Sequence, residues 1–309
     1  MTKEGETMKT AAVIIAAGLM KCEGVPASMY KVGTASSAQH MVASFQKAGI
    51  SPVVLVLDEN SKKLEKQLGS SGALFLRCED GLAQCIKLAL DALPREYERL
   101  FFCTAGRPFI TPESFELMLA RKDGALLAAC KGRLGPLLLL SRKYADKLCQ
   151  SPARSLTKAA EILEPGLCLV ETEDPGLLLT PRKAAEDEAA LEKHQTALTR
   201  PLLDISVTGE KMLLGSKLIK LLRLVDTLRS VRAACEVSGM SYSIAWNLLN
   251  SAEEQLGYPL ITRNQGGRSG SGSELTDKGR SILSAYSAFE SAMNVKMNAL
   301  YEECFGNLI

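Results

Sequence analysis

Short apolar runs alternate with mixed apolar and polar segments over the first half of the 309-residue chain. The apolar runs at 11–17, 52–57, 74–76 and 100–103 have the length and the β-branched content of buried strands. Predicted helices lie between them, at 37–48, 61–68 and 84–92. Strands and helices that alternate in this way predict an α/β domain, with a Rossmann-like, mainly parallel sheet between two helix layers.

The last third of the chain has a different pattern. Two helices are predicted from apolar residues at helical spacing, namely Leu218, Leu221, Leu222 and Val225, then Val231, Ala234 and Cys235. Gly239 supplies a turn, and Ser241 is a suitable N-cap for a third helix. Its expected buried stripe is Ala245, Leu248, Leu249, Ala252 and Leu256. Strands at 259–263 and 274–276 then enclose a Gly/Ser-rich loop, which indicates a mainly α winged-helix domain.

These patterns divide the chain into residues 9–195, a linker at 196–212, and residues 213–309. A charged helix over 183–196 is expected to be solvated and to lead into the linker. Apolar residues at helical spacing over 279–300 predict a long last helix. It is expected to pair two subunits, and packing against its own domain is the alternative.

The third helix of the second domain carries a polar face opposite its buried stripe. In a helix-turn-helix, the second helix of the pair presents such a face to the DNA major groove. A glycine-rich wing lets the backbone approach a phosphate strand, and arginines there add positive charge. The expected DNA contacts are Ser241, Tyr242, Ser243, Trp246, Asn247, Asn250, Arg263, Arg268 and Ser269. Packing of the Trp246 ring against the first helix is at least as well supported as a base contact. For the two arginines a solvated role is the alternative, and phosphate contact is favoured.

The run Ser241-Tyr242-Ser243-Ile244-Ala245-Trp246, the glycines at 266–270, and Leu275-Thr276 with Gly279 resemble the winged-helix domain of ModE-type molybdate-responsive regulators. The resemblance to the LysR-type family is looser, and about a quarter of the chain is covered. It implies a transcription regulator that binds double-stranded DNA as a homodimer. No oxyanion-sensing domain of the ModE kind follows in this sequence, so an effector would act through the first domain or a partner.

A second resemblance covers roughly residues 10–191. Ile15-Ala16-Ala17-Gly18, Gly24, Gly33, Gly81, the run 105–113 and Asp174-Pro175-Gly176 are similar in order to MobA-like nucleotidyltransferases, including the molybdenum cofactor cytidylyltransferases. The resemblance implies a nucleotide or molybdopterin-type ligand at the carboxyl ends of the strands. The candidate ligand-binding residues are Ala16, Ala17, Gly18, Lys21, Gly24, Lys31, Gly81 and Gly106. Ordinary loop turns explain Gly18 and Gly24 equally simply.

The sequence departs from that family where charge is needed. Cys22 and Ala27 stand where the family has an arginine and a lysine, and Gly106 replaces its magnesium-binding aspartate. No acidic residue follows the strand expected at 177–179, and Gly135 replaces a histidine of the cytidylyltransferases. A shifted register would bring in Lys21 and Lys31, and substitute metal ligands would have to come from Asp58, Glu79 or Asp80.

Nucleotidyl transfer relies on Mg²⁺ held by carboxylates, and one missing carboxylate costs several kcal/mol, or about a thousandfold in rate. The favoured hypothesis is therefore a DNA-binding regulator of molybdenum or molybdopterin metabolism with a catalytically degenerate first domain, which serves as a sensor of a small-molecule effector or as a dimerisation module. The alternative is an active molybdopterin cytidylyl- or guanylyltransferase that also binds DNA. Constitutive DNA binding without an effector is a third interpretation.

Composition changes this picture little. Lys and Arg total 37 against 35 Asp and Glu, so bulk charge does not indicate a nucleic-acid partner and DNA binding must depend on local placement. The nine cysteines form no Cys-x-x-Cys pair, which indicates a reducing cytoplasm and gives no positional support for a redox pair. Neither a signal peptide nor an apolar run of roughly 20 residues is apparent, so we expect a cytoplasmic protein without a membrane partner.

Overall fold

The computed structural model describes residues 9–17, 21–58, 61–68, 71–150, 152–263 and 272–305. The chain forms two compact units, and the boundary between them lies between Arg200 and Pro201. Among the described residues, no helix combines the length and the hydropathy that crossing a bilayer requires.

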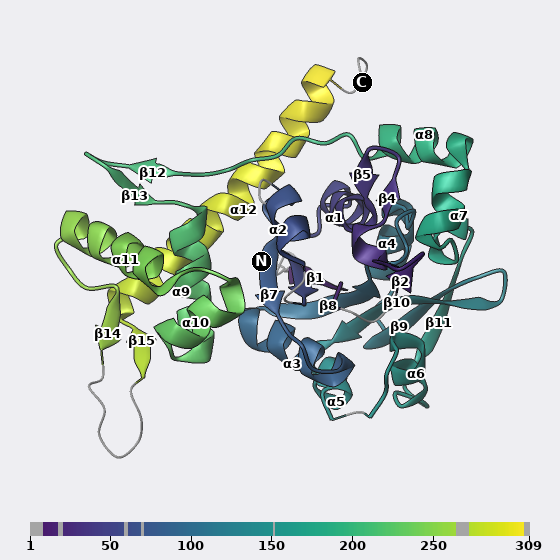
Figure 1. Cartoon of the computed structure of the whole chain (residues 1–309), viewed down its shortest axis with the longest axis horizontal. Helices are drawn as coiled ribbons and strands as arrows, with labels where there is room; N and C mark the ends of the chain where they lie inside the picture. The colour runs from purple at the N-terminus through teal and green to yellow at the C-terminus, as the bar shows by residue number, and fades with distance from the viewer. Residues whose placement is uncertain are drawn as a thin grey trace, which may run out of the picture. The chain divides into compact units, whose positions relative to one another are not determined.

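A seven-stranded sheet forms the centre of the first unit (Figure 1). Its strands are β1 (Lys9–Ile15), β6 (Val53–Leu57), β7 (Leu74–Arg77), β8 (Tyr97–Thr104), β9 (Ala125–Cys130), β10 (Arg133–Ser141) and β11 (Cys168–Thr172). The strand order is β11-β9-β10-β8-β1-β6-β7. β1 runs parallel to β6 and β8, and β10 runs antiparallel to β8 and β9. The predicted mainly parallel α/β fold is confirmed, with one antiparallel strand that the sequence analysis did not foresee.

Helices cover both faces of this sheet (Figure 1). On one face α1 (Ser37–Lys47) and α4 (Pro112–Leu119) pack against the strands, and Phe45 stacks on Phe115 at 4.1 Å between ring centroids. The other face is covered by α3 (Leu82–Ala92), α5 (Arg142–Leu148) and α6 (Leu156–Glu161). Because both faces are buried, strands such as β1 and β6 are apolar throughout and show no alternation.

Short elements complete the first unit between its strands. They are β2 (Lys21–Cys22), β3 (Val25–Pro26), η1 (Ala27–Met29), β4 (Lys31–Val32), β5 (Ala35–Ser36), α2 (Lys62–Gln67), η3 (Pro175–Leu177), α7 (Pro181–Glu186) and α8 (Glu188–Ala197). β2 pairs with β3 and β4 pairs with β5, so the segment after β1 folds into two small hairpins.

Two predicted elements of the first unit are wrong. The strand expected at 177–179 is absent, because Pro175 and the side chain of Asp174, which accepts from the amide of Gly176, begin a 3-10 helix there. The single helix expected over 183–196 is two helices, because Asp187 leaves the helical conformation and accepts a hydrogen bond from the amide of Ala190 to begin α8.

The second unit is a helix-turn-helix followed by a two-stranded wing (Figure 1). Its elements are β12 (Val207–Thr208), β13 (Met212–Leu214), α9 (Ser216–Leu228), α10 (Val231–Ser238), α11 (Tyr242–Leu256), β14 (Ile261–Arg263), β15 (Ser273–Leu275) and α12 (Asp277–Phe305). Gly239 ends α10 at φ +70°, and the hydroxyl of Ser241 then caps α11. The predicted mainly α winged-helix fold is confirmed. Residues 207–214, most of which were assigned to the linker, form the β12–β13 hairpin.

The start of α12 is fixed closely against the end of α11. Thr276 caps α12 by accepting from the amide of Gly279 at 2.9 Å, and its own amide donates to the carbonyl of Leu260. A Cβ added at Gly279 would lie 2.2 Å from that carbonyl oxygen, so only glycine fits without moving the backbone.

We therefore expect Gly279→Ala to lower the unfolding free energy of the second unit by about 2 kcal/mol, the usual cost of overpacking. Calorimetric unfolding of the full chain measures this as a lower transition temperature. Ser284→Ala on the exposed side of the same helix is the matched control and should leave that transition in place. An unchanged transition in Gly279→Ala would contradict the close contact.

Candidate DNA-binding face and candidate ligand cavity

α11 separates its residues into a buried stripe and an exposed stripe. Ala245, Leu249 and Ala252 are buried against the rest of the unit, whereas Ser243, Asn247 and Asn250 are exposed on the other side. The α11 positions predicted to contact DNA are therefore on the surface, with Trp246 as a partial exception.

The first turn of α11 carries an aromatic pair. Tyr242 is 53% exposed, and Trp246 is half-buried with its ring edge-on to Tyr242 at 5.8 Å. Ser241 is exposed, and its hydroxyl oxygen accepts a hydrogen bond from the amide of Ile244. This end of the helix carries the positive end of the helix dipole, which favours an approaching phosphate.

The β12–β13 hairpin is tied to the carboxyl end of α11. Gln255 accepts from the amide of Lys211 at 3.2 Å and donates to the carbonyl of Met212 at 3.3 Å. A groove of about 570 Å³ lies between the hairpin and the helix and includes Asn247 and Ser251 in its lining. The hydrogen bonds anchor the hairpin far from Ser243, so Ser243 stays open to solvent.

The wing begins at strands β14 and β15, which pair Arg263 with Ser273. Arg229, at the end of α9, holds the wing through its carbonyl, which accepts from the amide of Ser273, and through an ion pair with Glu274 at 3.3 Å. Arg268 and Ser269, two of the predicted DNA contacts, lie outside the described residues. The structure describes the backbone of Arg263, the last residue of β14.

In the first unit, Ala16, Ala17 and Gly106 lie together at the carboxyl ends of β1 and β8. All three are buried, and the space between them is about 10 Å³, no more than one water molecule needs. Ser28 contributes to this closure by donating to the carbonyl of Ala16. Gly18, the remaining candidate of this loop, lies outside the described residues.

The other candidate ligand-binding residues of the first unit do not line the space at the ends of β1 and β8. Lys21, Gly24 and Lys31 are exposed on the two small hairpins, and Gly24 sits at φ +81° in the β2–β3 turn. Gly81 borders a separate cavity of about 530 Å³ together with Arg154. The described residues therefore do not assemble the predicted ligand residues into one site.

The proposed substitute metal ligands lie just beyond the ends of the neighbouring strands β6 and β7. Asp58 accepts a hydrogen bond from the hydroxyl of Ser61 at 2.7 Å, and Glu79 and Asp80 are exposed at the end of β7. Within the part of the chain that the structure describes, no three His, Cys, Asp or Glu side chains are placed to hold a metal ion.

Two cysteines meet where the sequence analysis saw no pair. Cys78 follows β7 and Cys85 lies in α3, and the carbonyl oxygen of Asp80 is within reach of both sulfurs, at 3.7 and 3.4 Å. A hydrogen bond from Cys85 lowers the pKa of Cys78 to about 7, whereas the same bond raises the pKa of Cys85. The available signal was their spacing, because a short loop and about one helical turn separate the two cysteines across a strand-to-helix junction.

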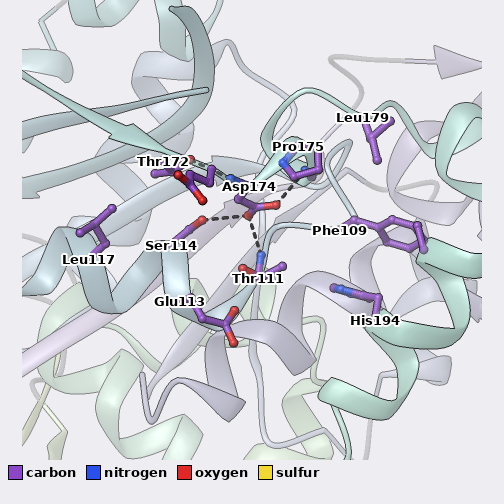
Figure 2. A pocket seen from close by; sticks show the side chains of 13 residues that line it. Phe109, Thr111, Glu113, Ser114, Leu117, Thr172, Asp174, Pro175, Leu179 and His194 are labelled. Atoms are coloured by element: carbon purple, nitrogen blue, oxygen red, sulfur yellow. Dashed lines mark hydrogen bonds between the residues drawn. The ribbon is translucent and has the colours of Figure 1, made fainter. Parts of the chain in front are cut away.

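A cavity of about 410 Å³ that the sequence analysis missed lies beside α4 (Figure 2). Its wall comes from the start of α4, the turn after β11 and the inner side of α8. Asp174 builds this wall: its carboxylate accepts from the amide of Thr111 at 2.9 Å, the hydroxyl of Ser114 at 2.8 Å and the amide of Gly176 at 2.8 Å. Gly176 is required here, because a Cβ would meet the carbonyl oxygen of Phe109 at 1.8 Å.

His194 closes the cavity from α8, and it is 5% exposed. Its ring lies 4.7 Å from that of Phe109 and 5.3 Å from that of His40. Burial, with a smaller contribution from His40, lowers the pKa of His194 to about 4, so the ring is neutral at pH 7. Its Nε2 has no hydrogen-bond partner in the structure. The prediction of a solvated helix is wrong for this residue, and a buried histidine cannot be told from a surface one by sequence alone.

The model of the MobA-like NTP transferase domain matches residues 12–167, just over half of the chain. The chain belongs to the MobA-like NTP transferase family. In the MobA-like unit, two positions where the family resemblance leads us to expect a lysine and a histidine hold small residues that are packed into the fold. Ala27 is 4% exposed in η1, and Gly135 packs so closely that a Cβ would lie 2.8 Å from Leu177. A larger side chain at position 135, such as the expected histidine, would displace Leu177 from the core.

The second family match is the bacterial regulatory helix-turn-helix protein of the LysR family, at residues 216–280. The molybdenum transport protein ModE of Azotobacter vinelandii is 34% identical over 84 residues, which are 27% of this chain and 31% of that protein. The transcriptional regulator ModE of Haemophilus influenzae is 28% identical over 105 residues, 34% of this chain and 41% of that protein. The chain therefore spans less than half the length of these relatives.

Two solved structures share the fold of the MobA-like unit. A nucleotidyl transferase from Methanothermobacter thermautotrophicus has a TM-score of 0.51 at 15% identity and covers 62% of this chain and 98% of its own. A homologue of Mycobacterium tuberculosis rv0371c from mycobacterium sp. strain JC1 has a TM-score of 0.50 at 15% identity, with 60% and 97% covered. At this identity the likeness shows the fold alone.

The low pKa of His194 predicts a pH-dependent stability. The unfolded chain takes up a proton near pH 6.5 that the folded ring accepts only near pH 4, so the MobA-like unit loses stability as pH falls from 6.5 towards 4. Between pH 7 and pH 5 the loss should be about 2 kcal/mol from this ring alone. Burial also lowers the pKa of His40, which therefore adds to the loss of stability at low pH.

Urea unfolding of the full chain at the two pH values measures this loss. His194→Phe, which keeps an aromatic ring beside Phe109, should reduce the pH dependence by about that amount, since other titrating groups cancel in the comparison. Equal pH dependence in the two proteins would show that His194 is protonated normally in the folded state.

Proposed function

We propose that this protein is a DNA-binding transcription regulator of molybdenum or molybdopterin metabolism, whose MobA-like unit serves as a sensor or dimerisation module instead of a catalyst. The observation that carries the proposal is the exposed polar face of α11, in a helix-turn-helix with a wing, within a chain that is similar to ModE proteins. The molybdenum connection comes from those relatives.

The proposed DNA contacts on α11 are Ser241, Tyr242, Ser243, Trp246, Asn247 and Asn250, with the wing residues Arg263, Arg268 and Ser269 on the flanking phosphates. Asn247 is placed to read bases, because an asparagine amide can donate and accept at once on the edge of adenine. Arginines of the wing would bind phosphate, whose contribution to affinity is independent of sequence and sensitive to salt.

Asn247→Ala should weaken binding to the promoter of the protein's own operon by about 1–3 kcal/mol and leave non-specific binding and the salt dependence unchanged. Arg268→Ala should instead weaken all DNA about equally and make the salt dependence shallower. Fluorescence anisotropy at several salt concentrations measures both effects.

Glu254→Gln, on the exposed carboxyl half of α11, is the control for Asn247 and should leave promoter specificity intact. If the wild-type protein shows no sequence preference at any salt concentration, the regulator hypothesis fails.

The sensor role rests on how the nucleotidyltransferase positions are filled. Ala16, Ala17 and Gly106 leave about 10 Å³ between them, and Ala27 is buried where the family's lysine would reach the triphosphate. Among the described residues, no three His, Cys, Asp or Glu side chains are grouped as metal ligands. These features favour a retained scaffold that has lost its phosphate chemistry.

Family membership itself favours the second candidate, an active molybdopterin cytidylyl- or guanylyltransferase that also binds DNA. Release of pyrophosphate from CTP or GTP by the purified protein, dependent on a divalent metal and on a molybdopterin acceptor, would establish it. No release with any nucleotide in the presence of that acceptor would exclude it.

We further propose a homodimer that forms through α12. Tyr286 and the Arg223–Glu290 ion pair, at 2.8 Å, attach the first half of α12 to its own unit. Phe289, between these two attachment points, and Leu300, near the end of the helix, remain 50% and 57% exposed, which is an apolar surface that a partner helix would cover.

Leu300→Glu should shift the protein from dimer to monomer in analytical ultracentrifugation, because a carboxylate would be buried in the apolar contact. Asn298→Glu, which adds the same charge at an exposed polar position two residues away, is the control and should remain dimeric. A Leu300→Glu protein that stays fully dimeric would place the dimer contact elsewhere.

A further inference from the structure

The cavity beside α4 contains one buried polar atom without a partner. His194 is 95% buried, and the carbonyl of Pro108 accepts a hydrogen bond from its ring. Since Nε2 has no partner, that bond uses Nδ1, and the neutral ring then carries a bare lone pair at Nε2. Figure 2 shows the ring on the wall of the cavity, opposite the side chains of α4. A buried acceptor left unpaired costs roughly 1–3 kcal/mol, which a ligand that donates to it would recover.

The remaining polar groups of the cavity also favour a donor. The hydroxyl of Ser114 is used by Asp174, and that of Thr172 donates to the carbonyl of Ala129 at 3.2 Å. The Asp174 carboxylate is occupied by three donors. Glu113 and Glu173, exposed at the rim, offer carboxylate oxygens, which accept hydrogen bonds only.

The charge of the lining excludes one class of ligand. Neither lysine nor arginine is present among the residues that line the cavity, whereas three of them are acidic. Phosphates and oxyanions are therefore repelled, and a neutral or weakly cationic molecule is favoured.

The walls and the size define the shape of the ligand. Phe109, Leu117, Leu179 and Ala190 supply apolar surface, and Leu117 is 44% exposed at the entrance. A volume of about 410 Å³ lies within the usual range for small-molecule sites. Flat apolar walls with a few acceptors at their edge suit a planar ring that carries N–H groups.

We propose that this cavity binds a nitrogen-rich aromatic base, without its phosphates, whose N–H groups donate to Nε2 of His194 and to the carboxylate of Glu113. The base lies against the apolar wall formed by Phe109 and Leu179. Its use as the effector of the regulator rests on the proposed function, but the binding itself does not.

Titration of the full chain with 2-aminopurine, a fluorescent base with ring and exocyclic N–H groups, tests the proposal. We expect saturable binding at one site and at least tenfold weaker binding of its riboside triphosphate. His194→Phe should weaken binding of the base about tenfold, which is about 1.4 kcal/mol. Glu113→Gln should weaken it severalfold, whereas Glu116→Gln, the same change on the same helix outside the cavity, should stay within about twofold of wild type.

Nitrogen NMR reports directly on Nε2 of His194, whose signal would not respond to the base if the residue only supported the fold. The chain has two histidines, so the signal of the unprotonated Nε2 of His194 can be assigned with one variant. On addition of 2-aminopurine this signal should shift as the lone pair accepts a hydrogen bond. Binding that is unchanged by both His194→Phe and Glu113→Gln, tighter binding of the triphosphate, or no binding of the base would overturn the proposal.

DNA binding by the same proteins separates this inference from the proposed function. His194→Phe and Glu113→Gln should bind the promoter as the wild type does in the absence of ligand. If the protein binds the base but no promoter DNA, the proposed site is supported and the regulator hypothesis fails. If the promoter binds and the base does not, the regulator hypothesis stands and the site falls.

Discussion

The buried carboxylate of Asp174 is the interaction on which the carboxyl edge of the MobA-like unit depends. It accepts three hydrogen bonds, from Thr111, Ser114 and Gly176, and so joins the end of the last strand to the first turn of α4. Those donors would otherwise be buried without partners, and an ionised group out of water is tolerated only when it is fully hydrogen-bonded. The three bonds fix the turn after β11 against the start of α4, and both segments contribute to the wall of the cavity that His194 lines.

In the same unit, the carboxyl ends of β1 and β8 leave little space between them. Small side chains at Ala16, Ala17 and Gly106 bring the ends of β1 and β8 together, and the hydroxyl of Ser28 donates into the gap. The residues that line this gap are uncharged, whereas three acidic residues line the cavity beside α4. An uncharged aromatic ring and a triphosphate would not share one binding mode here.

The sequence predicted the parts of the fold that have a distinct local pattern. Apolar runs bounded by glycine located β1, β6 and β8, and Ser241 after Gly239 located the start of α11. β9 and β10 were not located, because a fully buried strand such as Leu137–Leu140 has no period that distinguishes it from a helix. The cavity was missed for a related reason: Asp174, Thr111 and His194 lie far apart along the chain, and the hydrogen bonds that assemble them leave no local signature.

One glycine sets the geometry with which two copies of this protein would meet an operator. At Gly279 the backbone of α12 touches the backbone of Leu260 with no side chain between them, so the helix axis is locked to the recognition module and does not swing on a tether. In a dimer paired through α12, the separation of the two α11 helices is then a property of rigid packing. The dimer would therefore accept only a narrow range of half-site spacings on the DNA. It would bind operators with one base pair added or removed at the centre more weakly.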